Sequence, residues 1–122
     1  MNSALTVFIG GGLGSLTRYG VSLIVLRISP KIIFPMATLL SNVASCIVFA
    51  LALLFLTDKM SVPLSLRLLL LTGFCGGFST FSTFSYETIE LFRTGNAFYA
   101  VASILLNLIC CFLVIWFLAS KQ

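Results

Sequence analysis

The chain has 122 residues, of which 60% are hydrophobic and only 8% are charged, with seven Lys or Arg, three Asp or Glu and no His. A soluble domain of this length could not cover its core with so few ionisable side chains, so a water-soluble globular protein is excluded. The apolar excess must face lipid, which predicts an all-α integral membrane protein.

Four stretches are long enough to cross a bilayer as helices, which takes roughly 20 mainly apolar residues each. They cover residues 4–26, 34–57, 66–92 and 97–119, and the short turns between them hold five of the ten charged residues. A secretory signal is disfavoured at the first stretch, because it contains three successive glycines and follows no basic segment. The whole chain, residues 1–122, is therefore predicted to be a single four-helix transmembrane domain.

The first span carries a small-residue face and one deeply placed charge. Gly10 and Gly14 are four residues apart, a spacing that lets another helix approach closely. Arg18 in this span and Glu87 in the third are the only charges well inside the spans. We interpret them as a pair at comparable depth or as guards of a vestibule, and the alternative is that Arg18 extends to the membrane interface.

The second span places an amide, Asn42, beside Ser41 and about one turn after Thr38. A polar group in hydrocarbon is costly enough that it usually faces a partner or a pathway. Asn42 is therefore predicted either to hydrogen bond to another helix or to donate to an anion. Asn107 in the fourth span has the same two interpretations.

The third span has glycines at positions 73, 76 and 77, near its middle. Glycine weakens a helix, and irregular backbone at membrane depth is tolerated only where it is buried in protein or lines a polar site. We predict a helix broken at this glycine-rich centre, where freed carbonyls would suit a hard cation such as sodium. The alternative is that the glycines permit a close helix crossing.

A dense hydroxyl segment follows, because every residue from 79 to 85 except Phe81 and Phe84 is Ser or Thr. Residues three apart share a face of a helix, so the rings form one stripe and the hydroxyls form two. Hydroxyl hydrogens and the partly positive ring edges can together hold a small anion stripped of water. The alternative is that each hydroxyl bonds to the carbonyl one turn back.

Basic residues outside the deep positions are evenly divided between the two predicted membrane faces: Lys59, Arg67 and Lys121 on one, and Arg27, Lys31 and Arg93 on the other. Orientation normally follows an excess of Lys and Arg on the cytoplasmic side. The absence of bias predicts insertion both ways round and an antiparallel, dual-topology homodimer, unless other cellular factors set the orientation. A four-helix unit scarcely encloses a path of its own, so a pathway is expected between subunits.

The cysteines at positions 46, 75, 110 and 111 all fall inside predicted spans. They form no CxxC pair and no histidine is present, so disulfide or metal chemistry is disfavoured. We interpret them as small buried packing residues.

Three segments together resemble the bacterial Fluc fluoride channels: residues 11–19, the Thr38-Leu39 pair before Asn42, and above all residues 73–85. The resemblance spans the whole chain. It implies a dual-topology dimer with two antiparallel pores at the subunit interface, and a structural sodium ion at the dimer centre held by the backbone carbonyls of Gly76 and Ser79.

The resemblance also implies roles for individual side chains. Phe81 and Phe84 would contact fluoride with their ring edges, and Asn42 would be the pore amide. Arg18 would be the basic residue toward the vestibule. Hydroxyls of the third span would form a polar track near Glu87: Ser82, Thr83 and Ser85. The family pattern departs at Ala37, Ser45 and Cys110-Cys111, which leaves open whether the fourth span lines the pore.

The implied function is passive, selective export of fluoride across a bacterial inner membrane, in which the protein sits as a multi-pass channel and not as an enzyme. The competing class is a small proton-coupled multidrug exporter, which would need a carboxylate embedded in the membrane, as expected in the first helix. That helix has no acidic residue. A non-transporting scaffold would leave the hydroxyl and phenylalanine stripes unexplained, and a hydrolase would need a base beside its serine.

Overall fold

The computed structural model describes residues 2–57 and 61–120, and within them the secondary structure is helical. The elements in chain order are α1 (Ser3–Ile28), α2 (Met36–Thr57), α3 (Leu64–Arg67), the π-helical η1 (Leu68–Cys75), α4 (Gly76–Phe78), α5 (Phe81–Arg93) and α6 (Ala97–Ala119). In these ranges four stretches are long and apolar enough to cross a membrane: Ser3–Ile28, Met36–Thr57, Leu64–Arg93 and Ala97–Ala119. The prediction of an all-α protein with four membrane-spanning helices is therefore confirmed. Lys59 and Lys121, which entered the count of loop charges, lie outside the described residues.

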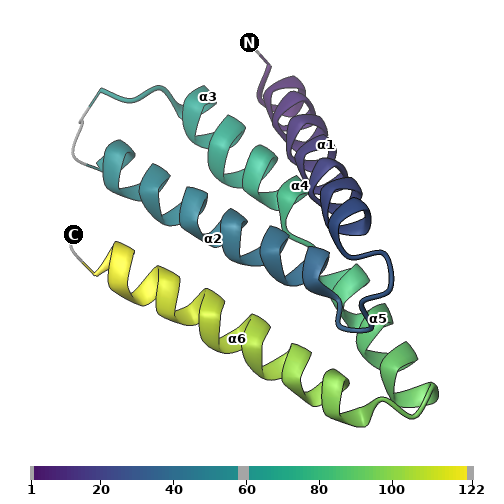
Figure 1. Ribbon diagram of the computed structural model, residues 1–122. Coiled ribbons are helices and arrows are strands. Elements are labelled where there is room, and N and C mark those ends of the chain that lie inside the picture. Colours follow the sequence, from purple (N-terminus) through teal and green to yellow (C-terminus); the bar gives the residue numbers. More distant parts are fainter. Residues whose placement is uncertain (1, 58–60, 121–122) are drawn as a thin grey trace.

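The third span crosses the bundle and has a different neighbour along each half. Its first half, η1 with α4, packs along α1, whereas α5 packs against α6. α2 runs beside α6 and also contacts α1 and η1, so it lies between the two halves of the bundle (Figure 1). The start of α1 and the end of α6 lie toward the same end of the bundle. This course brings the middle of the third span against α2.

Glycines set the spacing between α1 and the third span. A Cβ atom at Gly10 would collide with the carbonyl oxygen of Leu69, and one at Gly14 would collide with that of Phe74. Gly77 likewise lies directly against the backbone of α1. The small-residue face of α1 therefore serves a close helix crossing within one chain, in which backbone meets backbone.

Two residues with extended backbone, Ser79 (φ −79°, ψ 158°) and Thr80 (φ −149°, ψ 121°), separate α4 from α5. The glycines that precede them remain in η1 and α4, so the irregular backbone follows the glycine-rich segment instead of coinciding with it. The Thr80 hydroxyl caps α5 by accepting a hydrogen bond from the backbone N–H of Thr83 at 3.2 Å. A cap of this kind satisfies one donor that a helix start leaves free.

Small and polar residues fill the interior, and large apolar side chains cover the outside. The buried polar residues are Thr6, Thr38, Ser41, Ser45, Thr88, Ser103 and Asn107. Leu, Ile and Phe side chains are exposed on every span, as in the case of Phe8, which is 77% exposed on α1. Close packing through small residues, with hydrogen bonds between helices, is how spans associate when lipid removes the hydrophobic drive.

Candidate ion pathway

A cavity of about 240 Å³ lies where α2, α6 and the junction of α4 with α5 meet. Its walls combine aromatic rings, two amides and two thiols: Asn42, Cys46, Ser79, Thr80, Phe81, Phe84, Asn107, Leu108, Cys111 and Phe112. The second and third spans are thus joined at this place by residues from the fourth. A mostly apolar cavity with a few convergent polar groups is the usual form of a site for a small ligand.

Asn42 organises the polar side of this cavity. Its Oδ1 accepts a hydrogen bond from the backbone N–H of Thr80 at 2.8 Å, and this donor fixes which amide atom faces the third span. Its Nδ2 donates to Oδ1 of Asn107 at 2.9 Å and lies 3.4 Å from the carbonyl oxygen of Thr80. Asn42 therefore bonds two other spans at once, and one of its two N–H groups has only the longer contact.

Asn107 continues the chain of amides into α6. Its Nδ2 donates to the carbonyl oxygen of Ser103 at 2.9 Å, one turn back in the same helix. Its Oδ1 is thereby turned toward Asn42. A relay of hydrogen bonds runs from α6 through α2 to the backbone of Thr80, and it holds the extended residues at a set position relative to both helices.

The two phenylalanines lie on the first turn of α5, next to the relay. The ring centroids of Phe81 and Phe84 are 5.8 Å apart, with the planes tilted by 48°. Phe84 is half-buried, whereas Phe81 is 77% exposed on this chain. The edge of an aromatic ring is partly positive, so a ring edge that faces the cavity would attract an anion.

The hydroxyl residues of α5 divide into two groups. The Thr80 hydroxyl donates to that of Thr83 at 3.1 Å and lies 3.4 Å from that of Ser82, so these three form a cluster at the helix start. The Ser85 hydroxyl instead donates to the carbonyl oxygen of Phe81 at 2.8 Å, one turn back. Ser82, Thr83 and Ser85 lie outside the walls of the 240 Å³ cavity, while Phe81 lies in them.

Arg18 and Glu87 form no ion pair with each other in the described part of this chain, and each is bound to a different neighbour. Arg18 Nε donates to the carbonyl oxygen of Gly77 at 3.2 Å. This carbonyl needs a partner because α4 ends immediately after it, and Arg18 reaches it because it shares the face of α1 that packs on α4. Glu87 is instead bound by the hydroxyl of Thr38 on α2, which donates to Oε1 at 2.9 Å.

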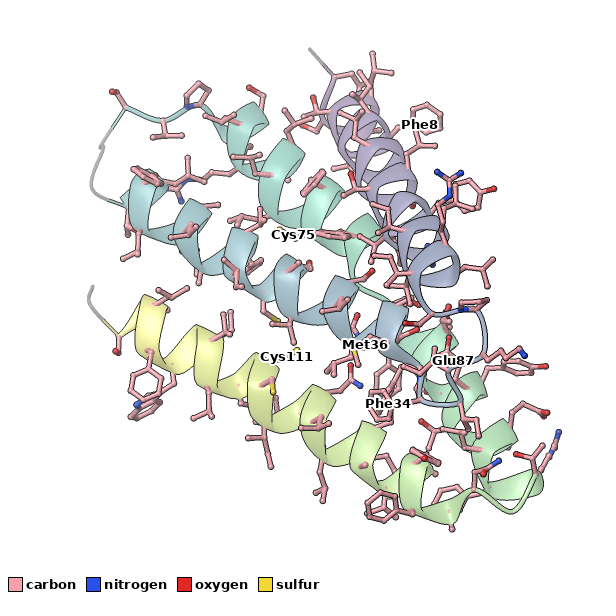
Figure 2. All side chains as sticks on the ribbon, viewed as in Figure 1. Phe8, Phe34, Met36, Cys75, Glu87 and Cys111 are labelled. Carbon is pink, nitrogen blue, oxygen red and sulfur yellow. The ribbon has the colours of Figure 1, made fainter. Side chains whose placement is uncertain are left out.

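Glu87 contributes to a separate cavity of about 320 Å³ at the end of the bundle. Phe34, Glu90 and Thr94 are among its other wall residues, and Figure 2 shows Glu87 near Phe34 and Met36. Its Oε2 is buried and has no hydrogen-bond partner within the described ranges. The carboxylate therefore has one free acceptor position next to a cavity of mixed polar and apolar walls.

Gly76 and Ser79 border a third cavity, of about 250 Å³, beside the first. Gly76 is exposed and has open space beyond its Cα, so its backbone faces outward from the bundle. The Ser79 hydroxyl donates to the carbonyl oxygen of Cys75 at 2.9 Å. That carbonyl also accepts from the hydroxyl of Ser45 at 3.0 Å, which is a further bond from α2 to the irregular segment.

The residues of α6 that line the cavity were not among the site residues predicted from the sequence, although a pattern in the sequence indicates them. Ser103, Asn107 and Cys111 recur every four residues in an otherwise apolar span, and Thr38, Asn42 and Cys46 do the same in the second span. Residues four apart lie on one face of a helix, so each set forms a polar stripe, and the two stripes face one another.

These features define a small membrane protein with four spans, in which a polar relay braces an irregular segment beside paired phenylalanines. The chain belongs to the family described as CrcB-like protein, Camphor Resistance (CrcB), whose model matches residues 5–118. The resemblance noted in the sequence is therefore confirmed.

Several relatives carry the name of fluoride-specific ion channel FluC. The chain is 42% identical over 106 residues to FluC 1 of Yersinia pestis, covering 87% of this chain and 82% of the relative. It is 43% identical over 112 residues to FluC of Rhizobium leguminosarum bv. trifolii, covering 88% and 89%. It is 36% identical over 115 residues to FluC of Coxiella burnetii, covering 93% and 92%. The match to the family model, over residues 5–118, includes the whole of the candidate pathway.

Proposed function

We propose that this protein is a fluoride-selective ion channel that lets fluoride leave the cytoplasm passively and so lowers its toxicity. The observation that carries the proposal is the meeting of Phe81, Phe84 and the amide of Asn42 in one cavity. It occurs in a chain whose relatives are named as fluoride-specific channels. The protein is a channel and not an enzyme.

Fluoride is small and strongly hydrated, so it enters an apolar passage only where other donors replace its water. The ring edges of Phe81 and Phe84 and one N–H of Asn42 supply such donors. The Asn42 N–H with only a 3.4 Å contact is the one that an anion recruits at least cost. A hydroxyl hydrogen can turn from its present acceptor toward an anion, so Ser82, Thr83 and Ser85, which lie beyond the cavity walls, would extend the track.

The two charged residues inside the spans, Arg18 and Glu87, act at the two ends of this track. Arg18 attracts the anion toward the vestibule, while Glu87 lies beside the cavity at the end of the bundle. Hydrogen fluoride crosses lipid as a neutral acid and ionises inside the cell, where the anion is trapped. A negative interior drives that anion outward at about 2.3 kcal/mol per 100 mV, so the channel needs no other energy source.

The functional unit is an antiparallel, dual-topology homodimer in a bacterial inner membrane. Two observations support it: the equal division of basic residues between the two faces, and the exposure of Phe81, which is 77% on a single chain. A ring that forms half of an anion passage needs a second wall, and a second copy of the chain would supply it. Each pathway then lies between subunits.

A structural sodium ion at the dimer centre fits the backbone of this region. Gly76 faces outward and Ser79 has extended backbone, so both carbonyls are candidates for a cation site on the dimer axis. Carbonyl oxygens suit a hard cation, and two of them are fewer than such an ion collects, which a second copy would correct. The ion would hold the two irregular segments together.

The test is fluoride efflux from proteoliposomes, read with a fluoride electrode after valinomycin is added. We expect rapid loss of fluoride, no loss of chloride from matched vesicles, and abolition of the flux by Phe81→Ile. Phe8→Ile is the matched control, because Phe8 and Phe81 are each 77% exposed and Phe8 lies on α1 away from the cavity (Figure 2). An intact reconstituted dimer that passes no fluoride would refute the proposal and favour the multidrug exporter.

A further inference from the structure

Two thiols face one another across the interface of α2 and α6. Cys46 and Cys111 both line the 240 Å³ cavity next to Phe84, and their side chains interact with each other. Figure 2 shows the Cys111 side chain between the two helices. The expectation of buried packing residues holds for Cys75, which is 4% exposed, but both members of this pair are half-buried.

The other two cysteines are placed differently. Cys75 is held beside Ser45, whose hydroxyl donates to its backbone carbonyl oxygen at 3.0 Å. Cys110 is the neighbour of Cys111 in sequence, so it points about 100° away around α6, and it does not line the cavity. Cys110 is half-buried like Cys46 and Cys111, so what sets the pair apart is that both of its members, from two different spans, line the cavity.

We propose that Cys46 and Cys111 form a two-thiolate site for a soft divalent cation of the mercury(II) class. The further claim that an ion bound there closes the pathway rests on the proposed function. Thiolates select soft metal ions. Zinc takes four ligands, and the described residues hold no group of three or more His, Cys, Asp or Glu that could bind a metal. The metal ion that fits this site is therefore one that binds stably with only two ligands.

Charge balance explains why the ion is divalent. Each thiol gives up its proton as its sulfur–metal bond forms, so one mercury(II) chloride and two thiols yield one neutral bis-thiolate, two protons and two chloride ions. No oxidation state changes. A neutral product is compatible with the apolar walls formed by Leu108 and Phe112, whereas a net charge there would be costly. Mercury(II) chloride is itself neutral, so it reaches the site through lipid.

The position of the pair predicts the effect on transport. Cys46 lies one turn after Asn42 and Cys111 lies one turn after Asn107, so a metal between the thiols sits beside the amide relay. It ties α2 to α6 and occupies space within the cavity. We expect fluoride efflux to fall by about tenfold or more, an obstruction equivalent to at least one decade in rate, and to recover when dithiothreitol removes the metal.

Binding is tested first, in the intact detergent-solubilised protein, without reference to transport. Mercury(II) chloride is titrated while the ultraviolet absorbance of mercury thiolates is followed, in the presence of a monothiol competitor. We expect one competitor-resistant ion per chain, because a second thiol held in place acts at an effective concentration of about millimolar or more. Cys110→Ser should retain this ion. Cys46→Ser and Cys111→Ser should lose it, as should Cys111→Ala, which guards against a variant that fails to fold.

Retention of the ion by folded Cys111→Ser and Cys111→Ala, or its loss from Cys110→Ser, would overturn the site. Efflux is then measured in the same proteins. Bound mercury with unchanged fluoride efflux would refute the closure of the pathway and leave the site standing. Absence of efflux from the untreated protein would instead count against the proposed function, so the two failures are distinguishable.

Discussion

Replacing Asn107 by leucine tests the amide relay directly. Asn107 is 5% exposed, and its Oδ1 accepts from Asn42 Nδ2 at 2.9 Å. Leucine keeps a similar volume but removes the acceptor, so the N–H of half-buried Asn42 that faced it loses its partner, and Nδ2 keeps only the 3.4 Å contact of its other N–H with Thr80. Leaving a buried donor unsatisfied costs about 1–3 kcal/mol in soluble proteins, and hydrogen bonds between membrane helices average about 0.6 kcal/mol with a maximum near 1.7.

We therefore expect Asn107→Leu to lose about 1 kcal/mol of stability. If the same energy orients Asn42 toward the anion, fluoride efflux falls about fivefold, since 1.36 kcal/mol corresponds to tenfold in rate. Thermal unfolding in detergent and efflux from proteoliposomes measure the two effects. Asn42→Ala and the double variant complete a mutant cycle, in which the second substitution should cost little once the first is present. Unchanged efflux in Asn107→Leu, or strictly additive losses, would refute the relay.

Two further predictions concern packing and capping. Gly14→Val should disrupt the crossing of α1 over the third span, because its Cβ would collide with the carbonyl of Phe74. The expected loss of stability is about 1–3 kcal/mol. Gly12→Val should leave the thermal unfolding temperature unchanged, because there is open space around Gly12. Thr80→Val should lose about 1 kcal/mol of stability, because the cap of α5 is removed. Thr88→Val should lose less, because the Thr88 hydroxyl bonds only within its own helix. Equal losses in the two variants would contradict the capping role.

The number and type of spans could be predicted from the sequence because they depend on local composition alone. A bilayer imposes one length and one polarity on each span, so uncharged stretches locate them. The observed α1 continues to Ile28 and the third span begins at Leu64, because backbone hydrogen bonding does not stop where hydropathy falls. Helix ends are accordingly the part of a span that hydropathy defines least well.

The partners of the polar residues could not be predicted in the same way, because they depend on how each helix is rotated about its axis. Arg18 and Glu87 were placed at similar depth, but depth says nothing about which faces meet. The face of Arg18 was in fact encoded, since Gly10, Gly14 and Arg18 recur every four residues on one side of α1. A glycine face that packs on the third span carries its arginine to the same neighbour.

The irregular segment persists at membrane depth because side chains from other spans replace the helical hydrogen bonds that it lacks. Arg18 donates to the carbonyl of Gly77, Ser45 donates to that of Cys75, and Asn42 accepts from the N–H of Thr80. The bonds from Arg18 and Asn42 pair backbone groups that would otherwise be left unpaired in an apolar medium, whereas Ser45 adds a further bond to a carbonyl that Ser79 already engages.

The same bracing decides which donors remain for an anion. Asn42 forms its two short hydrogen bonds, at 2.8 and 2.9 Å, with Thr80 and Asn107, while its second N–H has only the 3.4 Å contact. An anion that takes this N–H gives up little, and it leaves intact the bonds that hold the segment in place. Structural and conducting roles can therefore coexist in one amide, because its two N–H groups are unequally engaged.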